Sequence, residues 1–287
     1  VVILDYTIII LGETTMRTIC IINLKGGVAK TLSAVNMAHI LATVHNKRVL
    51  LIDNDKQGNT SKMFGLHSYD EKSVSDLLTE KNPDLDEIIA DTRYKFLDLI
   101  PANMNLLDAN KMTMIDSSWQ RETRFKKALQ PISGDYDYCV IDNAPDINIG
   151  IINALVMSDD IIIPIKIDQF AFDGLKELQR HIDSVKEDLN PKLRLMGCLV
   201  TCYSRNDVNA QGEEHLRTQL KYPVFVTHIR RTEKADESTF ATMPILEYSP
   251  RCGAARDYQT FVPIAELWTK LVTRQEIGPQ MSAHWKL

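Results

Sequence analysis

The sequence predicts an α/β fold in which helices cover both faces of a mostly parallel, doubly wound sheet, giving a three-layer sandwich. Apolar runs of strand length alternate along the chain with segments that have apolar residues at helical spacing. One apolar run leads into a glycine-containing loop and a helix, and two others end in aspartate. A chain of 287 residues can bury about three quarters of its unfolded surface, so this fold needs no disulfide or metal to hold it together.

The expected elements follow one another without an internal repeat or a low-complexity segment. The predicted strands lie at residues 19–22, 49–52, 96–103, 138–142, 161–165 and 193–201. The predicted helices lie at residues 32–42, 73–80, 121–129 and 153–160, then from residue 172 onward, and finally at 253–273.

Two short apolar runs precede the first predicted strand. Asp5 and Gly12 interrupt them, no run reaches the length of a membrane span, and no basic segment precedes them as in a signal peptide. We therefore expect Met16 to be the natural start, with residues 1–16 a leader or a non-native extension. Residues 17–274 are predicted to form a single domain, followed by a C-terminal tail at residues 275–287.

The strongest functional signal is the loop Asn23–Thr31, which joins a predicted strand to a predicted helix. Gly26 and Gly27 let the backbone approach an anion closely, and the helix N-terminus offers unpaired N–H groups and a positive dipole end to phosphate. Lys30 can supply positive charge to the outer phosphates, and the hydroxyl of Thr31 can bind Mg²⁺. The sequence therefore predicts a phosphate-binding loop.

Two later apolar runs end in aspartate at the predicted carboxyl edge of the sheet. Asp53 and Asp55 follow one run, and Asp142 ends the other. Ligands of parallel α/β sheets bind at that edge. A carboxylate there can approach a Mg²⁺ ion that accompanies a bound phosphate, usually through water.

The segment Lys25–Thr31, with one lysine directly before the glycine pair and a second directly before the threonine, resembles the deviant Walker A loop of the ParA/MinD family of P-loop ATPases. The resemblance runs from about residue 18 to about residue 271, and it includes the segment Asp53–Asn59. Two positions depart from the family pattern. Ala29 stands where the family usually has glycine and adds a methyl group there, and Lys56 stands where the family has proline.

The resemblance implies that ATP and Mg²⁺ are the cofactors, and it implies roles for particular residues. The catalytic residues are Lys25, which contacts the nucleotide of a second subunit, Lys30, which contacts the phosphates, and Asp55, which orients the attacking water. The implied nucleotide-binding residues are Lys25, Gly26, Gly27, Val28, Ala29, Lys30, Thr31 and Leu32. The implied metal-binding residues are Thr31, Asp53 and Asp142.

Charge is distributed unevenly along the chain. The net charge of −5 argues against a protein that binds nucleic acid over its whole surface, but residues 191–287 hold 13 Lys and Arg against 10 Asp and Glu. In ParA-type relatives the segment that corresponds to residues 227–237 carries nucleotide contacts and basic residues for non-specific DNA binding, and Arg231 and Lys234 occupy the matching positions. The alternative is ordinary surface charge beside neighbouring acidic residues. We expect the polar run Tyr203–Asn206 to face the adenine.

Other residue types indicate no further site. The five cysteines lack the spacing of a metal site, which fits a reducing cytoplasm. We expect Arg124, Lys126 and Lys127 to form a solvated face of the helix predicted at 121–129.

The resemblance also implies partners. They are a second copy of the chain in an ATP-dependent homodimer, non-specific DNA, and a ParB-like protein that stimulates slow hydrolysis during segregation of a plasmid, mobile element or chromosome. The protein would be cytoplasmic, on the nucleoid when ATP is bound, and no membrane partner is expected.

Two alternative functions stay open. A MinD-like membrane-cycling ATPase would need a basic amphipathic C-terminal helix. A nucleotide-binding regulatory module with little turnover would fit Ala29 and Lys56.

Overall fold

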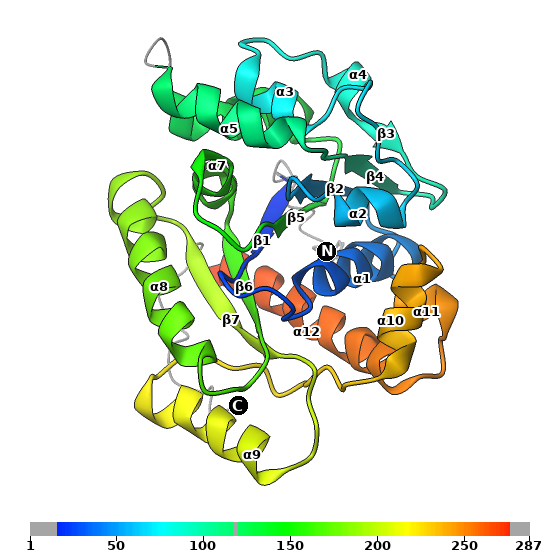
Figure 1. Ribbon diagram of the computed structural model, residues 1–287, viewed down its shortest axis with the longest axis vertical. Helices are drawn as coiled ribbons and strands as arrows, with labels where there is room; N and C mark the ends of the chain where they lie inside the picture. Colours follow the sequence, from blue (N-terminus) through cyan, green and yellow to red (C-terminus); the bar gives the residue numbers. More distant parts are fainter. Residues whose placement is uncertain (1–15, 117–119, 276–287) are drawn as a thin grey trace, which may run out of the picture.

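The computed structural model describes residues 16–116 and 120–275, and it contains a seven-stranded sheet with helices on both faces (Figure 1). The strand order is β3-β4-β2-β5-β1-β6-β7, and every neighbouring pair is parallel except β3 and β4. This topology confirms the predicted fold class. The strands are β1 Arg17–Ile21, β2 Val49–Asn54, β3 Ala90–Asp91, β4 Leu97–Ile100, β5 Tyr138–Asn143, β6 Asp160–Ile165 and β7 Arg194–Val200.

The helices alternate with the strands over most of the chain (Figure 1). They are α1 Lys30–Thr43, α2 Asn59–Met63, α3 Val74–Thr79, α4 Leu85–Ile88, α5 Asn105–Ile115, α6 Arg124–Leu129, α7 Ile149–Met157, α8 Ala171–Asp188, α9 Asp207–Glu214, α10 Glu233–Phe240, α11 Ile245–Tyr248 and α12 Gly253–Gln275. Helix α7 begins four residues earlier than expected because Asn148 caps it, accepting a hydrogen bond from the Ile151 N–H at 3.0 Å.

Two apolar cores flank the sheet because side chains alternate along each strand. On β2, Leu50 packs on the side covered by α3, α5, α6, α7 and α8. Its neighbour Leu51 packs on the other side, which is covered by α1, α11 and α12. All six residues of β2 and of β5 are buried, as expected for central strands of a parallel sheet. The two layers of helices are visible in Figure 1 on either side of the central strands.

The expectation that Arg124 lies on a solvated face is wrong. Its side chain is 2% exposed and crosses from α6 to the neighbouring helices. The guanidinium donates to the Leu78 carbonyl, to the Thr113 hydroxyl at 3.3 Å and to the Asp116 carboxylate at 2.7 Å. Arginine can be buried here because its planar fork of donors serves several acceptors at once. Only Lys126 and Lys127 of that trio are exposed.

Some expectations fall outside the described residues. The proposed leader, up to residue 15, and the proposed tail beyond Gln275 are among them. Met16 itself is hydrogen-bonded to the domain, since its N–H donates to the Ser133 carbonyl at 2.9 Å. Within the described part of the chain, each helix is too short or too polar to span a bilayer.

Candidate nucleotide-binding site

The loop between β1 and α1 is fixed from both sides by buried side chains. Asn23 donates to the Pro164 carbonyl at 2.8 Å and accepts from the Lys25 N–H at 2.9 Å. Further along, the Thr201 hydroxyl donates to the Val28 carbonyl at 3.0 Å. Pro164 of β6 and Thr201, directly after β7, therefore hold the loop in shape.

The loop backbone lies open to the space that it encloses. A Cβ added at Gly26 or Gly27 would meet no atom within 4 Å, and Gly27 has a φ of +70°, which favours glycine. Ala29 also lies in the left-handed region, with φ 60° and ψ 34°, directly before the first residue of α1. Ala29 stands where the family usually has glycine, and its side chain therefore strains the backbone at this position.

Replacing Ala29 by glycine is expected to stabilise the protein by about 0.5–1 kcal/mol. Glycine removes the strain energy of the left-handed backbone, and this gain is larger than the free-energy cost of the extra entropy that glycine gives the unfolded chain. Urea unfolding followed by circular dichroism measures the change. Ala128→Gly, in the regular helix α6, is the matched control and should cost about 1 kcal/mol. Equal losses in both variants would contradict the strain at Ala29.

Lys30 is the first residue of α1, and its side chain turns back over the loop. The residue is 7% exposed, and its ammonium donates to the Lys25 carbonyl at 2.9 Å. Burial lowers the pKa of Lys30, while the charges of Asp142, Asp55 and Asp146 act in the opposite direction. The ammonium is thus held beside several carboxylates at the mouth of the anion-binding loop.

Two aspartates lie side by side on the central strands. Asp53 of β2 pairs in register with Asp142 of β5, and both are fully buried. Burial, together with the charge of Asp142, raises the pKa of Asp53. Burial also raises the pKa of Asp142. Asp53 accepts from the Ser61 N–H and hydroxyl at 2.8 and 2.7 Å, and Asp142 accepts from the Thr60 hydroxyl at 2.8 Å.

One oxygen of this pair fits a divalent cation. Oδ1 of Asp142 is buried without a hydrogen-bond donor, and the Thr31 hydroxyl lies close enough to lower the pKa of Asp142. Within the described residues, no group of three His, Cys, Asp or Glu side chains could hold a metal without other ligands. This donor set suits Mg²⁺, which takes one or two protein oxygens and completes its shell with phosphates and water.

The loop opens into a cleft of about 1000 Å³ at the carboxyl edge of the sheet. One wall is the loop and the start of α1, and the segment Asp55–Gln57 forms the adjoining wall. The opposite wall consists of Cys202, residues 229–233 and part of α10 and α12. A cleft of this volume has the size of a pocket for a nucleotide-sized ligand.

The cleft contains most of the residues predicted for nucleotide binding, but not all of them. The lining residues from that prediction are Gly26, Gly27, Ala29, Lys30, Thr31 and Leu32, and Asp55 joins them. Lys25, Val28, Asp53 and Asp142 lie around the cleft without lining it.

The expected adenine-facing run Tyr203–Asn206 does not line the cleft. Cys202 does, whereas the ring of Tyr203 stacks on His228 with centroids 4.2 Å apart. Lys56, Lys166 and Tyr258 also face the cleft, and none of the three was predicted as a site residue. Lys56 and Lys166 follow strands that end at this edge, which is the signal that could have identified them.

Comparison with known proteins gives the family. Residues 16–195, more than half of the chain, match the family described as "AAA domain". The chain is 36% identical over 244 residues to the sporulation initiation inhibitor protein Soj of Bacillus subtilis, covering 84% of this chain and 95% of Soj. It is 33% identical over 247 residues to the chromosome partitioning protein ParA of Myxococcus xanthus, covering 85% and 86% of the two chains.

The chain belongs to the ParA/Soj family of partition ATPases.

Solved structures agree with this ParA-type assignment. A putative plasmid partition protein of Borrelia burgdorferi, bound to AMPPNP, superposes with a TM-score of 0.74 at 25% identity, covering 89% of this chain and 99% of that one. Cobyrinic acid a,c-diamide synthase of Mycobacterium smegmatis, with a bound ATP analogue and magnesium, gives a TM-score of 0.75 at 27% identity, covering 94% and 100%.

The first lysine of the ParA-type loop is engaged within its own chain. The ammonium of Lys25 forms an ion pair with Asp168, which follows β6, and this contact lowers the pKa of Asp168. The two basic residues predicted for DNA differ in their surroundings. Arg231 lines the cleft, whereas Lys234 is exposed on α10 and forms an ion pair with Glu237 at 2.6 Å.

Proposed function

We propose that this ParA-type protein is an ATP-dependent partition ATPase that uses Mg²⁺, and that ATP binding gates its dimerisation. The observation that carries the proposal is the single cleft in which the open glycine loop, Lys30 and Asp55 meet, beside the unsatisfied oxygen of Asp142. The two solved relatives with bound AMPPNP, or with an ATP analogue and magnesium, support ATP and Mg²⁺ as cofactors here.

The phosphates bind where the loop and α1 meet. Backbone N–H groups of the loop and the positive end of the helix dipole attract them, and Lys30 adds a full charge. Thr31 and Asp142 would hold Mg²⁺, which neutralises charge on the phosphate oxygens. The Lys30 ammonium exchanges its contact with the Lys25 carbonyl for a charged phosphate oxygen.

Hydrolysis requires a water molecule in line with the terminal phosphate. Asp55 lines the cleft and lies beyond the end of β2, where its carboxylate can orient that water. The water oxygen bonds to the terminal phosphorus while the bond to the bridging oxygen breaks. ADP leaves with the electron pair of that bond, and the proton lost by the water stays on the released phosphate. Lys30 and a second lysine stabilise the charge spread over the phosphate oxygens.

That second lysine is Lys25 from the other subunit of an ATP-bound dimer. Its place within the loop but outside the lining of its own cleft supports a role across an interface. In the single chain the Lys25 ammonium pairs with Asp168. On dimerisation it would leave Asp168 and contact the phosphates of the other subunit's nucleotide. A ParB-like partner protein would then act by favouring the hydrolysis-competent arrangement.

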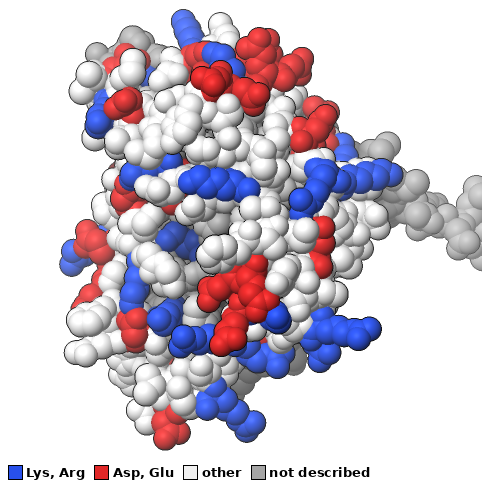
Figure 2. Space-filling view, turned by 45° about the vertical axis from the view of Figure 1, so that its right-hand side comes forward, with Lys and Arg blue, Asp and Glu red and all other residues white. Residues whose placement is uncertain are grey.

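The dimer binds DNA non-specifically through phosphate contacts from Arg231 and Lys234, which would place the ATP-bound form on the nucleoid within the cytoplasm. On the face in Figure 2, acidic side chains gather at the top, the end where α3 and α4 lie in Figure 1, while basic side chains surround a second acidic group lower down. A monomer with such a mixed surface attracts DNA only weakly. Doubling the basic segment in a dimer strengthens the attraction.

The test is the oligomeric state and DNA binding of the purified protein without nucleotide, with ADP–Mg²⁺ and with ATP–Mg²⁺, each at two salt concentrations. We expect dimers and salt-sensitive DNA binding with ATP–Mg²⁺ alone. Dimers that do not bind DNA would instead favour the membrane-cycling or regulatory alternatives, which liposome flotation and turnover measurements separate. The absence of any response to nucleotide would refute the proposal.

The double variant Arg231→Ala/Lys234→Ala tests the DNA face. We expect DNA affinity about tenfold or more lower, with the slope of log affinity against log salt reduced by about one per lost contact. Lys126→Ala/Lys127→Ala removes the same charge from exposed positions on α6 and is the matched control. Equal losses in both double variants would mean that net charge, and not this face, governs binding.

A further inference from the structure

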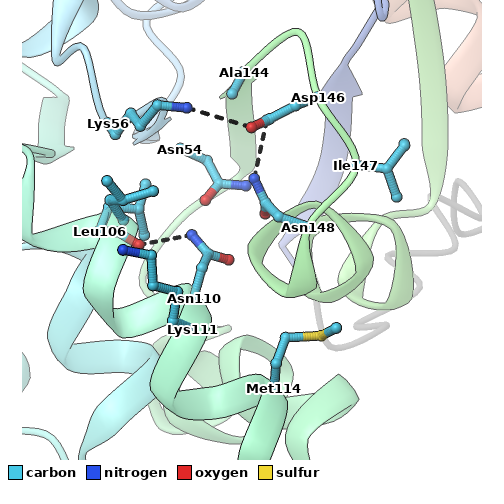
Figure 3. A pocket seen from close by; sticks show the side chains of 11 residues that line it. Asn54, Lys56, Leu106, Asn110, Lys111, Met114, Ala144, Asp146, Ile147 and Asn148 are labelled. Carbon is cyan, nitrogen blue, oxygen red and sulfur yellow. Dashed lines mark hydrogen bonds and ion pairs between the residues drawn. The ribbon is translucent and has the colours of Figure 1, made fainter.

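An ion pair joins the two loops that border the phosphate end of the cleft. The Lys56 ammonium lies 3.3 Å from Oδ2 of Asp146. Lys56 belongs to the turn after β2, and Asp146 to the loop between β5 and α7. Figure 3 shows the two side chains reaching toward each other from separate segments. A proline at position 56, as in the family pattern, could not make this contact.

On the β2 side, the pair restrains the turn that carries Asp55. Oδ1 of Asp55 accepts from the Gln57 N–H at 3.0 Å, and its carbonyl accepts from the Gly58 N–H at 2.8 Å. These bonds shape the turn but lie within it. The Lys56 side chain extends from the next residue and attaches the turn to a different loop, so it limits where the Asp55 carboxylate can lie.

On the β5 side, the pair is anchored to a buried helix. Oδ1 of Asp146 accepts from the Asn148 amide at 3.0 Å, and Asn148 in turn caps α7. Most of α7 is buried in the core. Lys56 is therefore linked through two side chains to a rigid element of the domain.

The pair spans a cavity instead of resting on packed side chains. A cavity of about 220 Å³ lies between α5 and the two loops, and its lining includes Leu106, Met114 and Ile147 (Figure 3). Lys56 borders both this cavity and the nucleotide cleft. Because Lys56 and Asp146 face this cavity, the ion pair, and not side-chain packing, links the turn to the neighbouring loop there.

We propose that Lys56 and Asp146 are positioning residues that hold Asp55 in the orientation used for ATP hydrolysis, an inference that rests on the proposed function. Neither residue needs to touch the reacting atoms. Their side chains are 30% and 45% exposed, and ion pairs this exposed contribute little to folding stability. A displacement of about 1 Å in a group that orients a reactant can lower a rate by up to about a hundredfold. The pair should therefore affect turnover and leave stability unchanged.

The experiment compares Lys56→Met, Asp146→Asn and the charge-swapped double variant Lys56→Asp/Asp146→Lys in steady-state ATP hydrolysis with DNA present. We expect each single variant to lower kcat about tenfold and to change KM by less than about twofold, because only positioning is lost. The swapped variant should recover most of kcat. Lys111→Met is the matched control, since Lys111 borders the same cavity but pairs with Asp108 on its own helix.

Other outcomes overturn the inference. If Lys56→Met raises KM and Asp146→Asn does not, Lys56 contacts the phosphates directly. If the swapped variant hydrolyses ATP as slowly as the single variants, an ion pair between positions 56 and 146 is not what positions Asp55.

A protein without measurable turnover would count against the proposed function, and hydrogen exchange then decides the inference separately. The amides of residues 55–60 should exchange faster in Lys56→Met than in the parent protein or Lys111→Met. Equal exchange in all three refutes the bridge.

Discussion

Lys30→Ala is expected to lower the affinity for ATP by about thirtyfold or more. The substitution removes a buried ammonium that meets the phosphates in a water-poor site, and losing one member of such a charged pair costs about 2–5 kcal/mol. Lys30 is 7% exposed and already faces the charges of Asp142 and Asp55. Isothermal titration with AMPPNP and Mg²⁺ measures the effect without hydrolysis.

Lys25→Ala is the matched control, because it removes the same charge from the other end of the loop. Lys25 does not line the cleft of its own chain, so the variant should bind AMPPNP within about threefold of the parent protein and yet fail to dimerise or hydrolyse ATP. If Lys25→Ala dimerises and hydrolyses ATP normally, the lysine has no role across an interface. If Lys30→Ala binds normally, the cleft does not hold the phosphates as proposed.

Arg124→Ala is expected to destabilise the protein by about 3–5 kcal/mol. The guanidinium is buried and joins α6 to the Leu78 carbonyl at the end of α3 and to Thr113 and Asp116 at the end of α5. Its removal takes the guanidinium donor away from the buried Leu78 carbonyl and from the Asp116 carboxylate, and it opens a void in the core. Urea unfolding gives the change in the free energy of unfolding.

Lys126→Ala, two residues along the same helix, is the control and should change stability by less than about 0.5 kcal/mol because Lys126 is exposed. A loss of similar size in both variants would show that α6 is sensitive to any substitution. A small loss in Arg124→Ala would show that the surrounding groups find other donors.

The sequence predicted the sheet and the position of the site because both depend on local patterns. Apolar runs that end in Asp53 and Asp142 mark buried parallel strands, and the strands pair in register so that the two carboxylates meet. The glycine loop before α1 could be identified for the same reason, since its backbone geometry requires particular residues. No long-range contact had to be known.

The errors concern contacts between distant segments. Nothing near Arg124 in the sequence indicates that the Leu78 carbonyl and Asp116 surround it. Tyr203 stacks on His228 and does not line the cleft, and this stacking depends on how residues 223–231 return beside β7. The ion pair between Lys56 and Asp146 could not be predicted either, because it joins residues 90 positions apart.

The two edges of the sheet restrict how copies of this protein can assemble. One edge is β3, which has two residues and runs antiparallel to its neighbour. The other edge, β7, exchanges backbone hydrogen bonds with the segment that returns beside it, through Cys198 with Pro223 and Phe225. Neither edge of the described sheet offers a long unpaired strand as a template, so growth into strand-paired aggregates is disfavoured. Self-association is left to loops and side chains, which can separate again without breaking the sheet.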